Sequence, residues 1–188
     1  MRIISGTKKG HSITSIKNSE VRPISDKNRE TIFNILVHGK EIINSDFTLE
    51  GCNLIDLFAG TGSFSFEALS RGSHKALLIE NNNEMIDVIY KNAKKLDFLD
   101  RIEVKNQNAC SFDNDDNHKF DLAYVDPPYG KNLAKRSVRN LIKKGMLNDN
   151  AIIVLEEEIK TEKSNFDELE LIREKQIGIS NFSFYKLI

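Results

Sequence analysis

Short apolar runs alternate with segments of helical periodicity along most of this chain, and no other feature constrains the fold as strongly. Five runs have the length and composition of buried strands: residues 52–58, 75–80, 101–107, 120–126 and 151–157. Amphipathic segments separate several of them, and in residues 81–96 the apolar side chains recur on one helical face. Because strands joined through helices pair in parallel, the pattern predicts one mostly parallel sheet that is covered on both faces.

The two ends of the chain depart from this alternation. Residues 168–188 form two extended segments around Gly178, which predicts an antiparallel edge on the sheet. Residues 2–16 alternate β-branched with polar side chains around two glycines, which predicts a small hairpin with a cationic turn. Ser25 is a good N-cap for a helix that would stop near Gly39. We therefore expect a hairpin extension over residues 1–24 and a main α/β domain over residues 25–188.

The composition excludes several classes of protein. The 188 residues suffice for one domain with its own core, and two cysteines cannot form a disulfide framework. No apolar run approaches the roughly 18 residues of a membrane helix, and the first residues lack the apolar segment of a signal peptide. The four histidines have no metal-ligand spacing, so we predict no metal site. These features favour a cytoplasmic protein that does not enter a membrane.

Charge is distributed unevenly, although the formal net charge is only −1. Residues 1–29 carry seven lysines and arginines against two acids, whereas residues 113–116 and 156–158 are acidic. We interpret the acidic stretches as solvated surface. The basic end is typical either of ordinary solvated surface or of a segment that contacts nucleic-acid phosphates.

A glycine loop follows the first predicted strand. In DLFAGTGSF, residues 56–64, Gly60 and Gly62 lie at the carboxyl end of the strand, where open parallel sheets bind their ligands. The third glycine of the dinucleotide fingerprint is absent, and no P-loop lysine follows. Asp56 precedes the loop, and Glu80 ends the next strand, where a carboxylate can accept both hydroxyls of a ribose. This set predicts a nucleoside that carries a positive charge, and S-adenosylmethionine fits that description.

The motif DPPYG, residues 126–130, follows the fourth predicted strand and therefore opens at the same edge of the sheet. Its two prolines fix the backbone and remove two N–H groups, which leaves a rigid edge of carbonyl acceptors. Asp126 and the Pro127 carbonyl can together hold a planar amine, while Tyr129 stacks on the base that carries it. The two motifs predict transfer of a methyl group from a sulfonium to an exocyclic amine.

The chain resembles the RsmD family of bacterial 16S ribosomal RNA guanine-N2 methyltransferases. The resemblance rests on DLFAGTG, on DPPY, on the basic N-terminus and on the RP, SD, RE and FNIL elements of residues 22–36. The resemblance covers nearly the whole chain, and its N-terminal part is the most specific. It implies a class I S-adenosylmethionine-dependent methyltransferase fold, which is Rossmann-like with a mostly parallel seven-stranded sheet. It also implies a 16S ribosomal RNA substrate within a 30S subunit or an assembly intermediate, and we expect a monomer.

The resemblance further implies the residues of the site. Around the cofactor it places Asp56, Phe58, Ala59, Gly60, Gly62, Glu80, Asn108 and Ala109. At the acceptor amine it places Asp126, Pro127 and Tyr129. At the lip of the cleft and along the RNA backbone it places Arg2, Lys8, Lys9, Arg22, Ser25, Asp26 and Arg29. The chain departs from the family pattern at Ile24, at Asn108 and in the acidic insert of residues 113–116, to which we assign no role. The Asn108 amide oxygen can still accept a hydrogen bond from an adenine amine.

Other functions remain open on the residues alone. An adenine-N6 DNA methyltransferase shares DPPY, although such enzymes usually carry a separate target-recognition region for which 188 residues leave little room. A non-catalytic RNA-binding assembly factor could use a methyltransferase scaffold, but such a scaffold would be expected to lose Asp126 or the loop glycines. A protein-glutamine methyltransferase is disfavoured because that class resembles NPPY.

Overall fold

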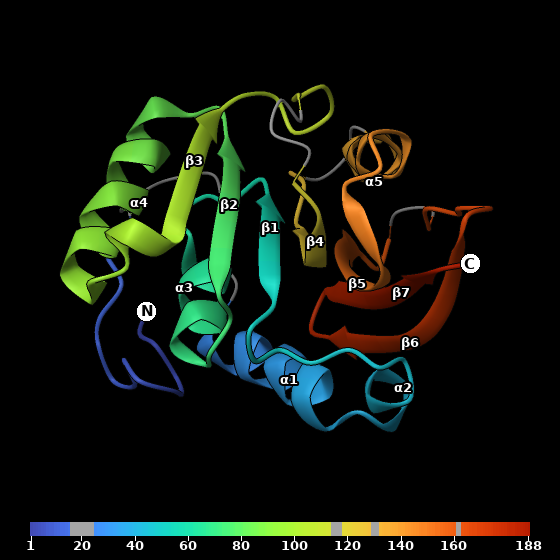
Figure 1. Ribbon diagram of the computed structural model, residues 1–188, viewed down its shortest axis with the longest axis horizontal. Helices are drawn as coiled ribbons and strands as arrows, with labels where there is room; N and C mark the ends of the chain where they lie inside the picture. The colour runs from blue at the N-terminus through green and yellow to red at the C-terminus, as the bar shows by residue number, and fades with distance from the viewer. Residues whose placement is uncertain (16–24, 114–117, 129–131, 161–162) are drawn as a thin grey trace.

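The computed structural model describes residues 1–15, 25–113, 118–128, 132–160 and 163–188 (Figure 1). Within these residues the centre is a seven-stranded sheet in the order β3, β2, β1, β4, β5, β7, β6. The strands are β1 (Asn53–Leu57), β2 (Lys75–Glu80), β3 (Ile102–Asn106), β4 (Phe120–Val125), β5 (Leu147–Glu158), β6 (Leu169–Ile177) and β7 (Ser180–Leu187). Strands β1 to β5 pair in parallel, and β7 lies antiparallel between β5 and β6. The predicted sheet and its antiparallel edge are therefore confirmed.

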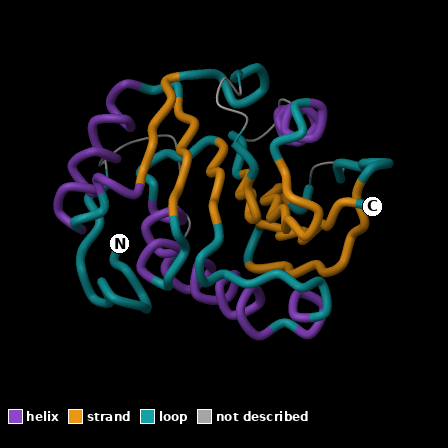
Figure 2. The backbone as a smooth tube through the Cα atoms, in the orientation of Figure 1, coloured by secondary structure: helices purple, strands orange, loops and turns teal. Residues whose placement is uncertain are grey.

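Helices cover both faces of the sheet (Figure 2). They are α1 (Asp26–His38), α2 (Lys40–Ile43), α3 (Ser63–Ser70), α4 (Asn83–Leu96) and α5 (Leu133–Lys143), with a 3-10 turn, η1 (Leu99–Arg101), before β3. Successive strand residues serve opposite faces: Leu54 packs with α1, α3 and α4, whereas Ile55 packs with α5. No helix in the described part of the chain is both long and apolar enough to cross a bilayer.

Local sequence accounts for where the helices begin and end. The Ser25 hydroxyl accepts a hydrogen bond from the Asn28 N–H at 3.1 Å and caps α1, as predicted, and Gly39 ends that helix. The Asn82 side chain caps α4 in the same way. Two features were not predicted: the single turn α2, which is too short to show a helical period, and the start of β5 at Leu147 rather than at residue 151.

The N-terminal hairpin is smaller than the alternation predicted. Its only bridge in the described part of the chain joins Arg2 to Ser12, and Ile3 beside it is fully buried. Gly6 adopts a φ of +80° because the turn presses against the end of α3, where a Cβ atom would lie 1.8 Å from the Ser70 carbonyl oxygen. The segment is therefore a turn docked on the main domain rather than a free arm.

Candidate active site

The glycine loop and the DPPYG loop lie side by side at the carboxyl edge of the sheet, because β1 and β4 are neighbouring parallel strands. The Asp126 N–H donates a hydrogen bond to the Leu57 carbonyl at 3.4 Å, which joins the start of the second loop to the end of β1. The structure thus brings the two motifs together. Tyr129, which the sequence assigns to base stacking, lies outside the described residues.

The two loop glycines serve different purposes. Both have a left-handed backbone, with φ of +55° at Gly60 and +74° at Gly62. At Gly62 a Cβ atom would lie 2.7 Å from the Phe66 ring and 3.1 Å from the Leu78 side chain, so this glycine allows α3 to pack on β2. At Gly60 a Cβ atom would face open space, its nearest neighbour among the described residues being the Phe58 carbonyl oxygen at 4.0 Å. Gly60 is therefore the position at which the loop can approach a ligand closely.

Glu80 supports the loop from the end of β2. One carboxylate oxygen accepts the Gly60 N–H at 2.8 Å, and the other accepts the N–H groups of Asn81 and Asn82 at 2.9 Å each. A carboxylate offers about four acceptor positions, so these three bonds leave capacity for one further donor. Ala59 adds a second tie between loop and sheet, because its N–H donates to the Ile79 carbonyl at 3.1 Å.

Asp56 is buried beneath the loop and is only partly satisfied. The Ser65 hydroxyl donates to its Oδ2 at 2.6 Å, whereas Oδ1 has no hydrogen-bond partner in the described structure. Burial raises the pKa of Asp56 to about 7, with a smaller raising effect from the negative charge of Glu80 and an opposing effect from the Ser65 hydrogen bond. A buried carboxyl with an unpaired oxygen is suited to a cationic or hydrogen-donating ligand.

The remaining cofactor candidates lie around this loop. Phe58 has a φ of +65° and packs against the layer that contains α5. Ala109 is buried in the same layer. Asn108 is exposed, and its side-chain oxygen accepts the Cys110 N–H at 2.9 Å, so it stabilises a turn and keeps one further acceptor position. These contacts are compatible with the predicted adenine contact but do not require it.

Asp126 and Pro127 form the start of the acceptor loop. Pro127 is buried and Pro128 is exposed, whereas Asp126 itself is only partly exposed. Burial raises the pKa of Asp126 well above its ordinary value, and the negative charges of Glu156 and Asp56 raise it further. A carboxylate with a raised proton affinity is a better acceptor for a proton than an ordinary aspartate.

Glu156 is part of this site, although the sequence suggested solvated surface. Only 5% of the residue is exposed, and its Oε2 accepts the Tyr124 hydroxyl at 2.8 Å. The Tyr124 ring stacks on Phe64, with centroids 3.8 Å apart and an interplanar angle of 4°. The burial of Glu156 was not predicted because it lies in a run of three glutamates. Strand alternation indicates it, because residues 152, 154 and 156 share one face of β5.

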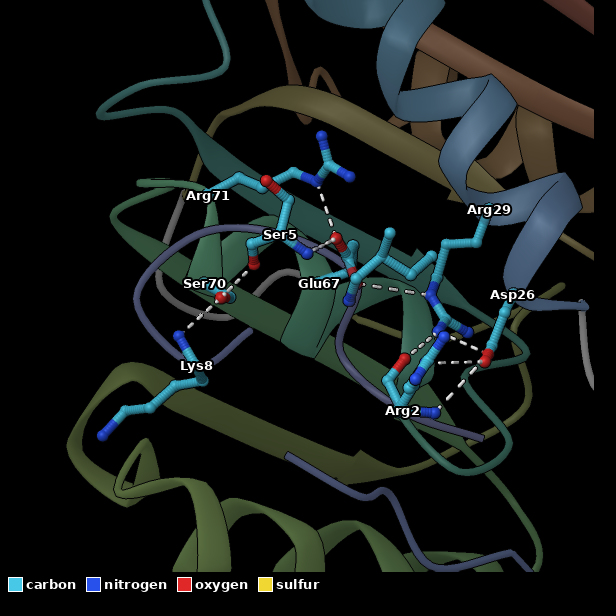
Figure 3. Close-up of polar contacts among 9 residues, drawn as sticks. Arg2, Ser5, Lys8, Asp26, Arg29, Glu67, Ser70 and Arg71 are labelled. Atoms are coloured by element: carbon cyan, nitrogen blue, oxygen red, sulfur yellow. Dashed lines mark hydrogen bonds and ion pairs between the residues drawn. The ribbon is translucent and has the colours of Figure 1, made fainter. Parts of the chain in front are cut away.

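Arg29 differs from its predicted place at the lip of the cleft. The residue is completely buried, and its guanidinium hydrogen bonds to the Arg2 carbonyl and to Asp26 Oδ1, the latter at 3.0 Å (Figure 3). Its Nε lies 3.6 Å from the Glu67 carboxylate. The prediction of a substrate contact is wrong for this residue, because position 29 belongs to the α1 face that carries Ile32 and the rest of the core.

Glu67 of α3 holds the N-terminal segment through its backbone. Its two oxygens accept the N–H groups of Ile4 at 2.8 Å and Ser5 at 3.0 Å, and the Arg71 Nε donates to it at 2.7 Å (Figure 3). Like Arg29, Glu67 is fully buried. No local pattern in the sequence indicates this contact, because Ser5 and Ile4 lie 62 and 63 positions before Glu67 along the chain.

The other predicted RNA contacts are spread over the N-terminal segment. Arg2 leaves 73% of its side chain exposed, and Lys9 is exposed. The Lys8 N–H donates to the Ser70 hydroxyl at 2.9 Å, so the basic turn sits at the last residue of α3. The hydroxyl of Ser25 is occupied in capping α1, Asp26 is tied to Arg29 and Arg2, and Arg22 lies outside the described residues. An eight-residue helix is about 12 Å long, so roughly that distance separates the turn from the glycine loop.

Asn92 of α4 connects the N-terminal segment to the glycine loop. It is fully buried, and its side-chain oxygen accepts the Thr14 N–H at 2.8 Å. Its side-chain NH2 donates to the Thr14 carbonyl and to the Thr61 carbonyl, both at 3.1 Å. One buried amide therefore fixes the end of the hairpin against the loop that would hold the cofactor.

Comparison with known proteins agrees with the resemblance seen in the sequence. A family model described as "Conserved hypothetical protein 95" matches residues 1–186. The chain is 31% identical to "Ribosomal RNA small subunit methyltransferase D" of Haemophilus influenzae over 189 residues, which cover 99% of this chain and 93% of that protein. It is 30% identical to the protein of the same name from Escherichia coli over 190 residues, with 99% and 89% covered.

A solved structure extends the likeness to three dimensions. The structure described as "Putative methyltransferase yhhF from Escherichia coli" superimposes with a TM-score of 0.84 at 29% identity, and the match covers all of this chain and 97% of that one. The matched region therefore includes the seven-stranded sheet.

Proposed function

The chain belongs to the family described as Conserved hypothetical protein 95, and on that premise we propose that it is an S-adenosylmethionine-dependent methyltransferase of small-subunit ribosomal RNA. Its class I methyltransferase fold agrees with this assignment. The observation that carries the proposal is the placement of the glycine loop and the DPPYG loop on neighbouring strands at one edge of the sheet. A methyl donor and a planar amine bound by the two loops would meet there.

The geometry of the first loop fits the methyl donor. Gly60 faces open space, so a nucleoside can approach its backbone without a clash. Asp56 offers a buried and unpaired oxygen to a positively charged group, and Glu80 keeps one acceptor position for a ribose hydroxyl. The donor supplies an electrophilic methyl group on a sulfonium. Phe58, Ala59, Gly62, Asn108 and Ala109 complete the proposed cofactor set.

The second loop is proposed to hold the acceptor. The Asp126 carboxylate and the Pro127 carbonyl accept the two hydrogens of an exocyclic amine, and Tyr129 stacks on its base. Positioning of the amine in line with the methyl group then contributes most of the rate enhancement, and the carboxylate stabilises positive charge on the nitrogen. We assign the amine as N2 of a guanine, in agreement with the family resemblance.

The N-terminal segment is proposed to select RNA. Residues 1–24 are its RNA-binding extension and residues 25–188 the catalytic domain. Arg2, Lys8, Lys9 and Arg22 would contact phosphates, and Ser25 and Asp26 would border the cleft. Because the basic turn lies about one helix length from the glycine loop, a substrate that contacts both must span about 12 Å, which an RNA of a few nucleotides does. The substrate in this proposal is a folded RNA in a 30S particle, and the enzyme is a monomer.

Methyl transfer from labelled donor tests the proposal. We expect label in unmodified 30S particles or naked 16S RNA, recovered as N2-methylguanosine after digestion, and none in duplex DNA. Asp126→Ala should reduce transfer at least a hundredfold while donor binding, measured by calorimetry, is retained, because Asp126 contacts only the acceptor.

Three outcomes would contradict the assignment. Label in DNA alone would replace it with an adenine-N6 DNA methyltransferase. Donor binding without transfer to any substrate would favour a non-catalytic assembly factor. Transfer by Asp126→Ala at the wild-type rate would remove the amine clamp from the proposal.

A further inference from the structure

Glu156 of β5 lies beside Asp126, which directly follows the neighbouring strand β4. In the parallel pair of β4 and β5, Tyr124 pairs with Val154 and Val125 pairs with Leu155. The next residues are Asp126, which directly follows β4, and Glu156 of β5, so Asp126 continues the line of the register at the carboxyl edge. Paired strands lie about 4.8 Å apart, and in-register residues of a parallel pair point to the same face. The two carboxyl groups are therefore close neighbours at the proposed acceptor site.

The described surroundings of the pair are neutral or acidic. Tyr124 donates to Glu156 at 2.8 Å, and Ser180 on β7 also hydrogen bonds to Glu156. Asp56 approaches from β1, with Glu80 beyond it, and α3 contributes Phe64 and Ser65. Among the described residues, the charges that act on Asp126 are those of Glu156 and Asp56, both negative. No group of histidine, cysteine or carboxylate side chains among the described residues is arranged to hold a metal ion.

Two adjacent buried carboxylates with no cation beside them among the described residues are both ionised only at a higher pH than isolated carboxyls. Burial disfavours each negative charge, and each charge disfavours the other, so the pair holds one proton over a range of pH in which isolated carboxyls are ionised. Such an arrangement costs stability, and a strand end that needed only packing would be better filled by an apolar side chain. The pair therefore suits chemistry in which a proton is taken up.

Methylation of an amine releases one proton. As the nitrogen–methyl bond forms, the sulfur–methyl bond breaks and its electron pair remains on sulfur, which leaves a neutral thioether. The nitrogen then loses one of its hydrogens as a proton and keeps the electron pair of that bond. Asp126 already contacts that hydrogen in the proposed complex, so it is the nearest base.

We propose that Glu156 is a positioning residue of the methyl transfer, which forms a carboxyl pair with Asp126 so that Asp126 takes up the proton released by the acceptor amine. Glu156 does not touch the substrate; it acts through its negative charge on Asp126. The proton later leaves to solvent through the exposed part of Asp126. This inference rests on the proposed function and adds to it a residue outside both sequence motifs.

Glu156→Gln tests the pair, because glutamine keeps the shape and the acceptor for the Tyr124 hydroxyl but removes the charge. The pKa of Asp126 should then fall, so the acidic limb of the kcat profile should move by roughly one pH unit toward lower pH. The plateau should fall by roughly threefold to tenfold, because Asp126 becomes a weaker base, while KM for RNA stays unchanged. Glu156→Asp, which restores the charge, should return the limb toward the wild-type position.

Glu157→Gln is the matched control. Glu157 is the next residue of β5, faces the opposite side of the sheet and hydrogen bonds to Ser164 at 2.7 Å. This variant should leave the acidic limb in place. A limb that does not move in Glu156→Gln, or that moves equally in Glu157→Gln, would overturn the inference.

A second measurement does not depend on turnover. The carbon-13 resonance of the Asp126 carboxyl, assigned by its loss in Asp126→Asn, should titrate at lower pH in Glu156→Gln than in the wild-type protein. An unchanged titration overturns the carboxyl pair even if the enzyme is active. Conversely, a wild-type protein that methylates none of the substrates above would contradict the proposed function, whatever the result of the Asp126 titration.

Discussion

The loop after β1 shows how two identical residues can be required for different reasons. Gly62 is needed by the fold, because a Cβ atom would overlap the Phe66 ring at 2.7 Å. At Gly60 the missing side chain leaves space that the described residues do not fill, and we propose that the ligand requires this space. The sequence motif alone cannot separate these roles, since both glycines occur in the same turn. Substitution by alanine separates them.

We expect Gly62→Ala to lower the free energy of unfolding by about 3 kcal/mol, through left-handed backbone strain and overpacking against Phe66. Gly60→Ala should cost only about 1 kcal/mol, because it carries the strain without the overlap. The same Gly60→Ala variant should weaken binding of S-adenosylmethionine more than tenfold. Urea denaturation and calorimetric titration measure the two quantities. A Gly60→Ala protein that binds the donor normally would show that the loop is not its site.

Residues of the site differ in how far the sequence revealed them. Asp56, Gly60 and Glu80 were predicted because they lie at the ends of strands, and the local sequence is enough to locate a strand end. Glu156 and Arg29 were misjudged because charged residues are buried only when distant partners are available. For Arg29 those partners include Glu67, which no local pattern connects to it.

Among the elements, α3 links the N-terminal segment to the active site. Its first residue follows the glycine loop, and its buried Glu67 binds the backbone of Ile4 and Ser5 (Figure 3). Asn92 on α4 adds a second link, through Thr61. The N-terminal segment is thus fixed relative to the loop by side chains of both helices.

Glu67→Gln should lower the free energy of unfolding by about 3 kcal/mol, because the buried Arg29 loses part of its counter-charge. The amide protons of Ile4 and Ser5 should also exchange faster, since a neutral amide is a weaker acceptor than a carboxylate. Urea denaturation and hydrogen exchange would measure these effects.

Glu84→Gln in the exposed first turn of α4 is the control, with an expected change within about 0.5 kcal/mol. Equal stability of the Glu67 and Glu84 variants would show that the buried network does not hold the segment.

The elements themselves were largely readable from the sequence. Strand runs and helical faces alternate strongly enough that β1 to β7 and four of the five helices were predicted in order. The turn α2 was not predicted because four residues are too few to show a helical period. The N-terminal hairpin is smaller than predicted because its backbone hydrogen bonds partly to α3 instead of to a second strand.

Considered as a whole, the molecule concentrates buried acids at one edge of its sheet. Asp56 comes from β1, Asp126 follows β4 and Glu156 comes from β5, and burial raises the pKa of each. Two of them belong to strands of the sheet and Asp126 directly follows a third strand, so the sheet holds them close together. The cost of keeping them together should therefore appear in the stability of the whole protein.

The pH dependence of unfolding should reveal this cost, and Asp56 supplies the clearest case. Its pKa rises from an ordinary value of 3.8 to about 7 in the folded protein. Between those values the folded state holds a proton that the unfolded chain has lost, so the free energy of unfolding falls as pH rises, by up to about 1.4 kcal/mol per pH unit. Above about pH 7 this contribution is fully lost.

Asp56→Asn should remove that slope, because an amide does not titrate. Urea denaturation between pH 5 and pH 8 should show the wild-type protein losing stability with rising pH, and Asp56→Asn losing distinctly less. Asp113→Asn is the control, because the Lys144 hydrogen bond lowers the pKa of that exposed carboxyl. The contribution of Asp113 to the free energy of unfolding therefore changes only at acidic pH. Between pH 5 and pH 8 the stability of this variant should change with pH as that of the wild-type protein does. Parallel slopes for Asp56→Asn and the wild-type protein would mean that Asp56 is already ionised in the folded protein over this pH range. Burial would then not raise its pKa as we expect.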